Sequence, residues 1–257
     1  MLDKASLQGM IEEKWCGRAK GYSEMVHEEL NGPIKDVWLK EIDSLVDFGP
    51  IKRPKVLDIG TGPGFFAIIL SQKGYGVSAI DCAPEMLKVA KDNCETYGVS
   101  PEFFLMDSHR LDFADETFDL LLSRNVTWTL YDPVAAYREW LRVLRPGGNL
   151  LIFDANWFNY LFDEAALERK RLAEKEALER FNLKPFEEPN RESSEIMYSS
   201  LPMGKYTRPE WDLALLTKLG YADIKIDPTL SDRVLEEPQK VQYSDTPMFA
   251  IRAKKPL

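Results

Sequence analysis

Three aspartates and a run of glycines occupy positions where they could bind one ligand together. Residues 56–65 read Val-Leu-Asp-Ile-Gly-Thr-Gly-Pro-Gly-Phe, a buried-strand pattern that leads into a glycine-rich turn and then a helix. Glycine reaches backbone angles that other residues avoid, and its missing side chain lets a ligand approach the main chain. The first N–H groups of the following helix have no partner within that helix. The stretch therefore predicts a ligand site at the end of a strand.

An acid ends each of the first three predicted strands: Asp58, Asp81 and Asp107. A dinucleotide-binding turn has the spacing Gly-x-Gly-x-x-Gly, whereas the glycines here are at 60, 62 and 64, and Asp58 would repel a pyrophosphate. Asp58 instead suits an ammonium group, and Asp81 stands where a carboxylate accepts both hydroxyls of a ribose. Asp107 could accept from the exocyclic amine of adenine. The three acids together predict a ligand that carries an ammonium group, a ribose and an adenine.

The elements that position these acids alternate regularly between strand and helix. Strands are predicted over residues 55–60, 76–81, 102–106, 118–123 and 149–154, with helices over 65–73, 84–97 and 132–145. Such alternation favours parallel strands with helices on both faces. Residues 223–227 and 247–254 predict a final antiparallel hairpin at one edge, joined by a polar loop over 228–243. The pattern predicts an α/β fold.

Two flanking regions break this alternation. The first 50 or so residues show helical spacing, most clearly over 22–30 and 34–48, and residues 163–181 predict a charged helix. Residues 182–205 are polar and contain prolines. Thr207 with Glu210 predicts a capping box for a helix that ends at residue 219. We therefore expect an N-terminal helical cover over residues 1–49 and a main domain over 50–257, with a lid insertion at about 157–205.

The segment over residues 55–154 resembles the class I S-adenosylmethionine-dependent methyltransferases. Besides the glycine turn and the three acids, the matching motifs in chain order are Ala-Pro-Glu-Met-Leu at 83–87, Phe-Asp at 118–119 and Leu-Arg-Pro-Gly-Gly at 144–148. It is most similar to the small-molecule subgroup that includes the ubiquinone-biosynthesis methyltransferases, also called methyltransferase type 11. The resemblance implies a Rossmann-like, doubly wound sheet of seven strands, mostly parallel with an antiparallel edge strand. It also implies S-adenosyl-L-methionine as cofactor, S-adenosyl-L-homocysteine as product and methyl transfer to a small-molecule acceptor.

The resemblance also implies residue roles. Gly60 and Gly62 would pass under the methionine part of the cofactor, and residues 123–126 would close over it. Met86 would pack on the adenine, although it could equally be part of the core. The full set of implied cofactor-binding residues is Tyr22, Asp58, Gly60, Thr61, Gly62, Gly64, Asp81, Cys82, Met86, Asp107, Ser108, Arg124 and Asn125.

The acceptor would enter beside the methyl group, at the ends of the fourth and fifth strands. Residues expected there are Trp128, Asn156, Trp157 and Tyr160, although the aromatic ones could serve packing alone. No catalytic base can be identified from the sequence. His27 is the candidate to test first, since neutral imidazole can take a proton near pH 7, and a plain exposed histidine is the alternative. His109 is expected to be a loop residue.

Composition narrows the remaining possibilities. The 257 residues include 33 Lys and Arg against 42 Asp and Glu, a net charge of −9 that disfavours nucleic acid as a partner. The basic cluster at 169–171 lies among glutamates and is expected to be a solvated helix face. Three cysteines without a Cys-x-x-Cys spacing, and two histidines, predict neither a disulfide framework nor a zinc site. Without a signal peptide or a long apolar run, we expect a cytoplasmic monomer or homodimer that binds no membrane.

Two other functions fit the same architecture. A nicotinamide-dependent oxidoreductase is disfavoured by the glycine spacing, by Asp58 and by the absence of a Tyr-x-x-x-Lys pair near the fifth strand. A protein that binds S-adenosylmethionine without transferring its methyl group is compatible with the sequence.

Overall fold

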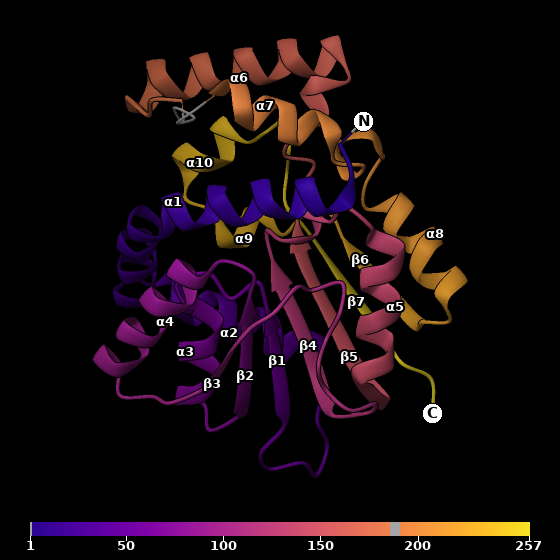
Figure 1. Ribbon diagram of the computed structural model, residues 1–257. Helices are drawn as coiled ribbons and strands as arrows, with labels where there is room; N and C mark the ends of the chain where they lie inside the picture. The colour runs from indigo at the N-terminus through magenta and orange to yellow at the C-terminus, as the bar shows by residue number, and fades with distance from the viewer. Residues whose placement is uncertain (1, 186–190) are drawn as a thin grey trace.

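The first five strands lie parallel in one sheet, as the alternation predicts (Figure 1). The computed structural model describes residues 2–185 and 191–257. The sheet has seven strands in the order β3-β2-β1-β4-β5-β7-β6, and β7 is antiparallel to both of its neighbours. The strands are β1 (Lys55–Ile59), β2 (Gly76–Asp81), β3 (Glu102–Leu105), β4 (Phe118–Arg124), β5 (Leu144–Asp154), β6 (Ala222–Asp227) and β7 (Phe249–Lys254). The expected doubly wound α/β fold is confirmed.

Helices cover both faces of the sheet, because successive strand residues point to opposite sides. Val56 of β1 packs in a core with α2 (Ile34–Leu45), α3 (Phe65–Gln72) and α4 (Pro84–Thr96). Its neighbour Leu57 packs in a second core with α5 (Pro133–Val143) and α8 (Glu210–Leu219). Both cores are dry, and this rigid sheet fixes where the strand ends lie.

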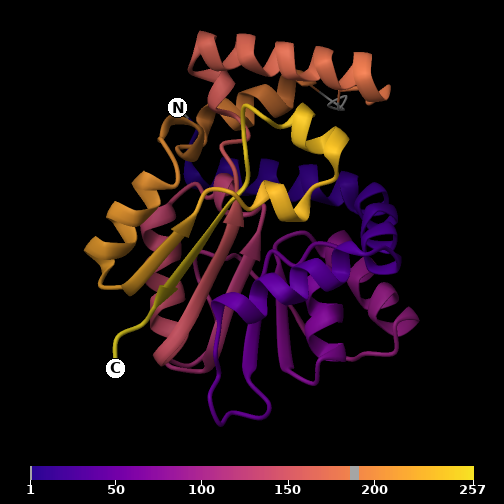
Figure 2. The same cartoon turned by 180° about the vertical axis from the view of Figure 1, so that it is seen from behind.

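The remaining helices lie above the carboxyl ends of the parallel strands (Figures 1 and 2). In Figure 2 the yellow connection to β7 rises beneath the helix at the top of the molecule. These elements are α1 (Lys4–Asn31), η1 (Thr127–Thr129), η2 (Asn159–Leu161), α6 (Glu164–Phe181), α7 (Arg191–Ser200), η3 (Met203–Lys205), α9 (Ser231–Val234) and α10 (Glu237–Gln242). Since strand ends and covering helices face one another here, a ligand can be held between them.

Three local expectations differ from the structure. Helix α1 starts at Lys4, where Asp3 accepts the N–H of Ser6 at 2.8 Å, well before the periodic stretch at 22–30. The polar connection over 228–243 is not a plain loop, since it contains α9 and α10. The irregular region over 182–205 contains α7 and η3, while its residues 186–190 lie outside the described part of the chain. All three helices are too polar or too short for a clear apolar period.

The capping box predicted from Thr207 and Glu210 is wrong. A capping box needs its two residues at the N-cap and at the third helical position. Helix α8 begins at Glu210 itself and follows Pro209, with no side-chain cap. Arg208 serves the first turn instead, donating from Nε to Oδ2 of Asp212 at 2.7 Å.

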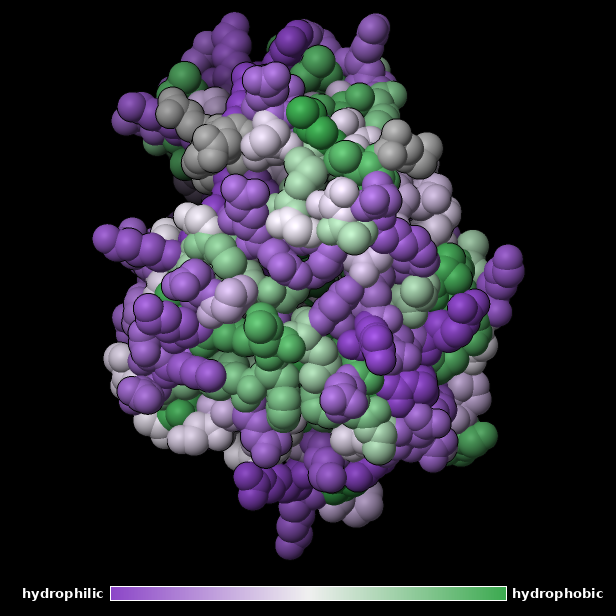
Figure 3. All heavy atoms as spheres, viewed as in Figure 1, coloured by the Kyte–Doolittle hydropathy of each residue, from purple (hydrophilic) through white to green (hydrophobic). Residues whose placement is uncertain are grey.

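Hydrophilic side chains project from the topmost helix, α6, in the space-filling view (Figure 3). They form pairs spaced along the helix, such as Arg180 with Glu176. Within the described ranges, every helix is too short or too polar to cross a lipid bilayer.

Candidate active site

The glycine turn between β1 and α3 adopts left-handed backbone angles at Gly60, Gly62 and Gly64, with φ of +66°, +52° and +93°. A Cβ at Gly60 would lie 2.5 Å from Cγ2 of Val126, and one at Gly64 would lie 3.3 Å from Cβ of Ala90. Those two glycines therefore allow close packing within the protein. A Cβ at Gly62 would meet no protein atom within 4 Å. Gly62 borders a cavity, so its bare backbone is open to a ligand.

Asp58 is buried beneath this turn, with 2% of its surface exposed. It accepts the hydroxyl hydrogen of Thr61 at 2.7 Å. Burial raises the pKa of Asp58 to about 6, because removing the carboxylate from water disfavours its charge. A buried acid in this state would gain from a cationic ligand.

Asp81 supports the turn from the end of β2. Its Oδ2 accepts the N–H of Gly62 and its Oδ1 accepts the N–H of Ala83, both at 2.9 Å. Burial raises the pKa of Asp81 to about 6. Since a carboxylate offers about four acceptor positions, two remain for a ligand's hydroxyl groups.

Asp107 is more heavily engaged than the sequence indicated. His109 binds its Oδ1 through Nδ1 at 2.6 Å, and the hydroxyl of Tyr131 donates to its Oδ2 at 2.6 Å. Burial alone would raise the pKa of Asp107, but these hydrogen bonds outweigh it and leave the pKa below its usual value. His109 stacks on Tyr131 with ring centroids 3.7 Å apart and lines the cavity. His109 is thus part of the site wall, and only its spacing after Asp107 hinted at this.

Arg124, at the end of β4, fastens helix α1 over the site. Its guanidinium donates two hydrogen bonds to Glu29, at 2.9 and 3.1 Å, and lies 4.6 Å from the ring centre of Phe65. The next residue, Asn125, has a φ of +57°, and its N–H donates to the carbonyl of Phe153. Arg124 therefore lines the cavity but spends its charge on α1.

These features surround one cavity of about 480 Å³ above the strand ends. Most of the expected site residues line it, namely Tyr22, Asp58, Gly60, Thr61, Gly62, Asp81, Cys82, Met86, Asp107, Ser108, Arg124, Asn125, Trp128, Trp157 and Tyr160. The cavity runs from the glycine turn to helices α6 and α10.

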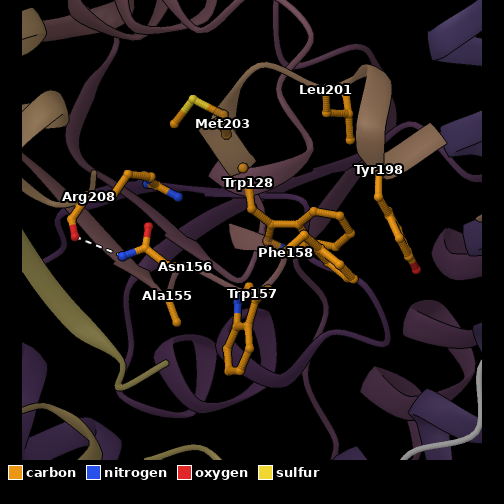
Figure 4. Close-up of a pocket in the computed structure, with 10 residues that line it drawn as sticks. Trp128, Ala155, Asn156, Trp157, Phe158, Tyr198, Leu201, Met203 and Arg208 are labelled. Carbon is orange, nitrogen blue, oxygen red and sulfur yellow. Dashed lines mark hydrogen bonds between the residues drawn. The ribbon is translucent and has the colours of Figure 1, made fainter. Parts of the chain in front are cut away.

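Aromatic side chains form one end of this cavity. The ring of Trp128 lies 4.7 Å from that of Phe158, and Phe158 stacks on Tyr198 at 3.8 Å. Figure 4 shows these three rings grouped together, with Trp157 directed away from them. Trp157 contacts Tyr243 edge to face at 5.5 Å.

Three expected site residues lie outside the main cavity. Gly64 packs against α4, as its close approach to Ala90 shows. Asn156 lines a separate pocket of about 10 Å³, and its amide donates to the carbonyl of Arg208 at 2.9 Å (Figure 4). His27 is on the outer side of α1, where its Nδ1 meets the hydroxyl of Tyr97 at 3.1 Å. A general base must reach the acceptor's proton, so this placement does not support His27 in that role.

Several cavity residues were missed by the sequence reasoning. Lys170 and Glu174 of α6 form an ion pair that lines the cavity, although the charge cluster at 169–171 was expected to be fully solvated. Tyr243 and Asp245, next to α10, also line it. No local pattern points to these residues, because only the packing of α6 on α10 brings them to the site.

The geometry fits S-adenosylmethionine. Buried carboxyl groups stand at the ends of β1 and β2, an open glycine lies between them, and Met86 and Ser108 continue the wall toward β3. Carboxylates suit an ammonium group and ribose hydroxyls, while apolar and small polar groups suit an adenine.

Comparison with known proteins agrees with this fit. A family model described as a methyltransferase domain matches residues 57–152. The chain is 34% identical over 112 residues to demethylmenaquinone methyltransferase of Thermus thermophilus, which spans 42% of this chain and 51% of that protein. It is 35% identical over 100 residues to phosphatidylethanolamine N-methyltransferase of Cereibacter sphaeroides, spanning 38% and 49%. The alignments thus cover about half the length of these two relatives.

The fold is shared with phosphoethanolamine N-methyltransferase 2 of Haemonchus contortus, solved with S-adenosyl-L-methionine. The match has a TM-score of 0.59 at 20% identity and covers 86% of this chain and 53% of that one. Family match, relatives and fold lead to one conclusion. The chain belongs to the class I S-adenosylmethionine-dependent methyltransferase family, and its cofactor is S-adenosyl-L-methionine.

Proposed function

We propose that this protein transfers the methyl group of S-adenosyl-L-methionine to a small-molecule acceptor bound in the 480 Å³ cavity. The observation that carries the proposal is the arrangement of that cavity. Its acids and open glycine lie at the ends of β1 and β2, and its aromatic rings lie beyond the ends of β4 and β5. A donor and an acceptor can therefore be held side by side.

We assign the cofactor's groups to the residues that fit them. Asp58 faces the ammonium group, Asp81 accepts the ribose hydroxyls, and Gly62 leaves room for the methionine part. Met86 packs on the adenine, and Asp107 with Ser108 borders its edge. The remaining expected contacts are Tyr22, Gly60, Thr61, Cys82, Arg124 and Asn125, all at the cavity wall.

The sulfonium of the bound cofactor supplies an activated methyl group. The chain contributes alignment of the two reactants and exclusion of water, which can account for most of the rate of such a transfer. Neither histidine is well placed as a base, since His27 lies apart and His109 is bonded to Asp107. We therefore propose that positioning, and not proton abstraction by histidine, drives the reaction.

We expect the acceptor to be compact and uncharged or weakly polar. Trp128, Trp157 and Phe158 offer flat apolar walls, which orient a ring or a thiol better than an extended chain. The net charge of −9 opposes a nucleic acid.

A cover over the site completes the proposal. Helix α1 and residues 157–205 close the cavity from above, through side chains such as Trp15 and Tyr198. Helix α2 buries Trp38 and Ile42 in the core, so we do not include it in the cover. A closing cover excludes water during transfer.

The test combines binding and turnover. Calorimetry with S-adenosylhomocysteine and with NAD should show binding of the first alone, and labelled S-adenosylmethionine should transfer its methyl group to members of a panel of small thiols, amines and phenols. Binding of NAD alone would indicate an oxidoreductase. Cofactor binding without transfer to the panel or to a metabolite extract would indicate a binding protein.

A matched pair of glycine variants tests the placement of the cofactor. Gly62→Ala and Gly49→Ala each put a side chain at a left-handed φ, +52° and +54°, where no protein atom lies within 4 Å. Both should lose about 1–2 kcal/mol of stability from backbone strain. Only Gly62→Ala should weaken S-adenosylhomocysteine binding, and equal affinities in both variants would contradict the placement.

A further inference from the structure

Asp154, the last residue of β5, is completely buried behind the aromatic end of the cavity. Its Oδ1 accepts the indole N–H of Trp157 at 3.0 Å. Its Oδ2 accepts the backbone N–H of Trp128 at 3.0 Å. One carboxyl group thus holds both tryptophans that we assign to the acceptor.

The carboxyl group is itself fixed by a buried cation. Arg208, whose side chain is 1% exposed, lies 3.4 Å from Oδ2 of Asp154 and donates to the hydroxyl of Thr127 at 2.6 Å. Thr127 in turn donates to Asp154. Arg208 also pairs with Asp212 at 2.7 Å, which receives the hydroxyl of Tyr137 at 2.5 Å. The network therefore connects η1, β5 and the start of α8.

Such a network is an expensive way to stabilise a core. Well-packed apolar residues often replace buried ion pairs without loss of stability, whereas removing one partner leaves an unpaired buried charge. What an apolar cluster would not provide is direction. The single N–H of an indole makes one directional bond, so its partner sets the orientation of the whole ring.

The orientation of both tryptophans depends on this group. Trp157 has its indole edge on Asp154 and its ring against Tyr243. Trp128 has its backbone on Asp154 and its indole N–H on the carbonyl of Asn125, at 2.9 Å. Its ring then meets Phe158 and Tyr198, as Figure 4 shows.

We propose that Asp154 is a positioning residue for the methyl acceptor, which holds Trp128 and Trp157 as the aromatic walls of the acceptor site while Arg208 fixes Asp154. This inference rests on the proposed function for its consequence, but not for its geometry. Asp154 does not act as a base, because it does not line the cavity and donors already occupy both oxygens.

The test replaces Asp154 by asparagine, which keeps the shape but turns one acceptor into a donor. The readout is the indole N–H signals of the six tryptophans in a ¹⁵N-labelled protein without ligand. The Trp157 signal should shift and exchange faster with water. The signal of Trp140, whose indole donates to the carbonyl of Ser108, is the internal reference and should stay in place.

Two further variants complete the design. Asp119→Asn is the matched control, since Asp119 is 6% exposed, is bound by Lys55 N–H and Arg145, and lies at the opposite end of the sheet. Trp157→Phe keeps an apolar ring and removes only the N–H that Asp154 accepts, so it remains informative if Asp154→Asn does not fold.

With tyramine and thiophenol as probe acceptors, Asp154→Asn and Trp157→Phe should raise KM about tenfold, the range expected for losing a hydrogen bond to a charged group. Affinity for S-adenosylhomocysteine should change less than about twofold. Asp119→Asn should leave both KM and the Trp157 signal unchanged. An unmoved Trp157 signal in Asp154→Asn, or an unchanged KM in Trp157→Phe, would overturn the inference. If the wild type methylates neither probe, that result counts against the proposed function, and the indole signal alone decides this inference.

Discussion

Acidification should weaken cofactor binding, because the two acids that we assign to the cofactor resist ionisation in the free protein. Burial raises the pKa of Asp58 and of Asp81 from 3.8 to about 6. A cationic ammonium group stabilises the carboxylate form of Asp58, and ribose hydroxyls donate to the carboxylate form of Asp81. Binding should therefore lower both pKa values, and the protein should release protons when the ligand binds near or below pH 6.

The magnitude follows from the two pKa values. A rise from 3.8 to about 6 corresponds to about 3 kcal/mol in favour of the neutral carboxyl. In the free protein this cost of ionisation is absent at low pH and is fully present above pH 6, so it opposes stability at neutral pH. The ionised fraction of such a group falls from about nine tenths at pH 7 to about one tenth at pH 5. The Kd for S-adenosylhomocysteine should thus rise about tenfold if one acid must ionise, and about a hundredfold if both must.

The assay is calorimetry with S-adenosylhomocysteine between pH 5 and pH 8, in two buffers with different ionisation enthalpies. The buffer dependence of the binding heat counts the protons released. The variants Asp58→Asn and Asp81→Asn bind more weakly at pH 7, and each should lose one proton from the count. A Kd that stays constant from pH 7 to pH 5 would refute the assignment of these acids to the cofactor.

Three other expectations are open to direct measurement. Hydrogen exchange in α1 and α6 should slow when S-adenosylhomocysteine is added, whereas equal protection would contradict a mobile cover. Gly60→Ala should lower stability in urea more than Gly62→Ala, because its Cβ would lie 2.5 Å from Val126; equal losses would show that Val126 moves aside freely. Trp157→Ala should weaken acceptor use while leaving the Kd for S-adenosylhomocysteine nearly intact, and the opposite pattern would place Trp157 in the cofactor site.

The sheet and the cofactor end of the cavity could be predicted because their signals are local. The glycine turn, Asp58 and Asp81 each stand directly at a strand end, and parallel strands bring such ends to one edge. The expected residues therefore converge without further information.

The acceptor end could be predicted only in part, because it is assembled from distant segments. Lys170 comes from a helix whose charge pattern is that of an exposed surface, and Asp245 follows a helix that was expected to be loop. His27 appeared suitable by residue type alone, but helix α1 directs it toward Tyr97. The link from Asp154 to Arg208 joins residues 54 positions apart and has no sequence signature.

Single residues also show where local rules fail. Thr207 and Glu210 have the spacing of a capping box, but the helix starts two residues later than that box requires. Arg208 occupies this place because its guanidinium is needed by Asp154 and Asp212 in the core. Tertiary contacts thus overrode the local preference.

The most direct test of the central claim is a crystal structure of this chain with S-adenosylhomocysteine. We predict that its ribose hydroxyls lie within hydrogen-bonding distance of Asp81, its ammonium group faces Asp58, and its sulfur points toward Trp128 and Trp157. A ligand bound elsewhere, or bound in this cavity with Asp58 and Asp81 both out of contact, would contradict the account.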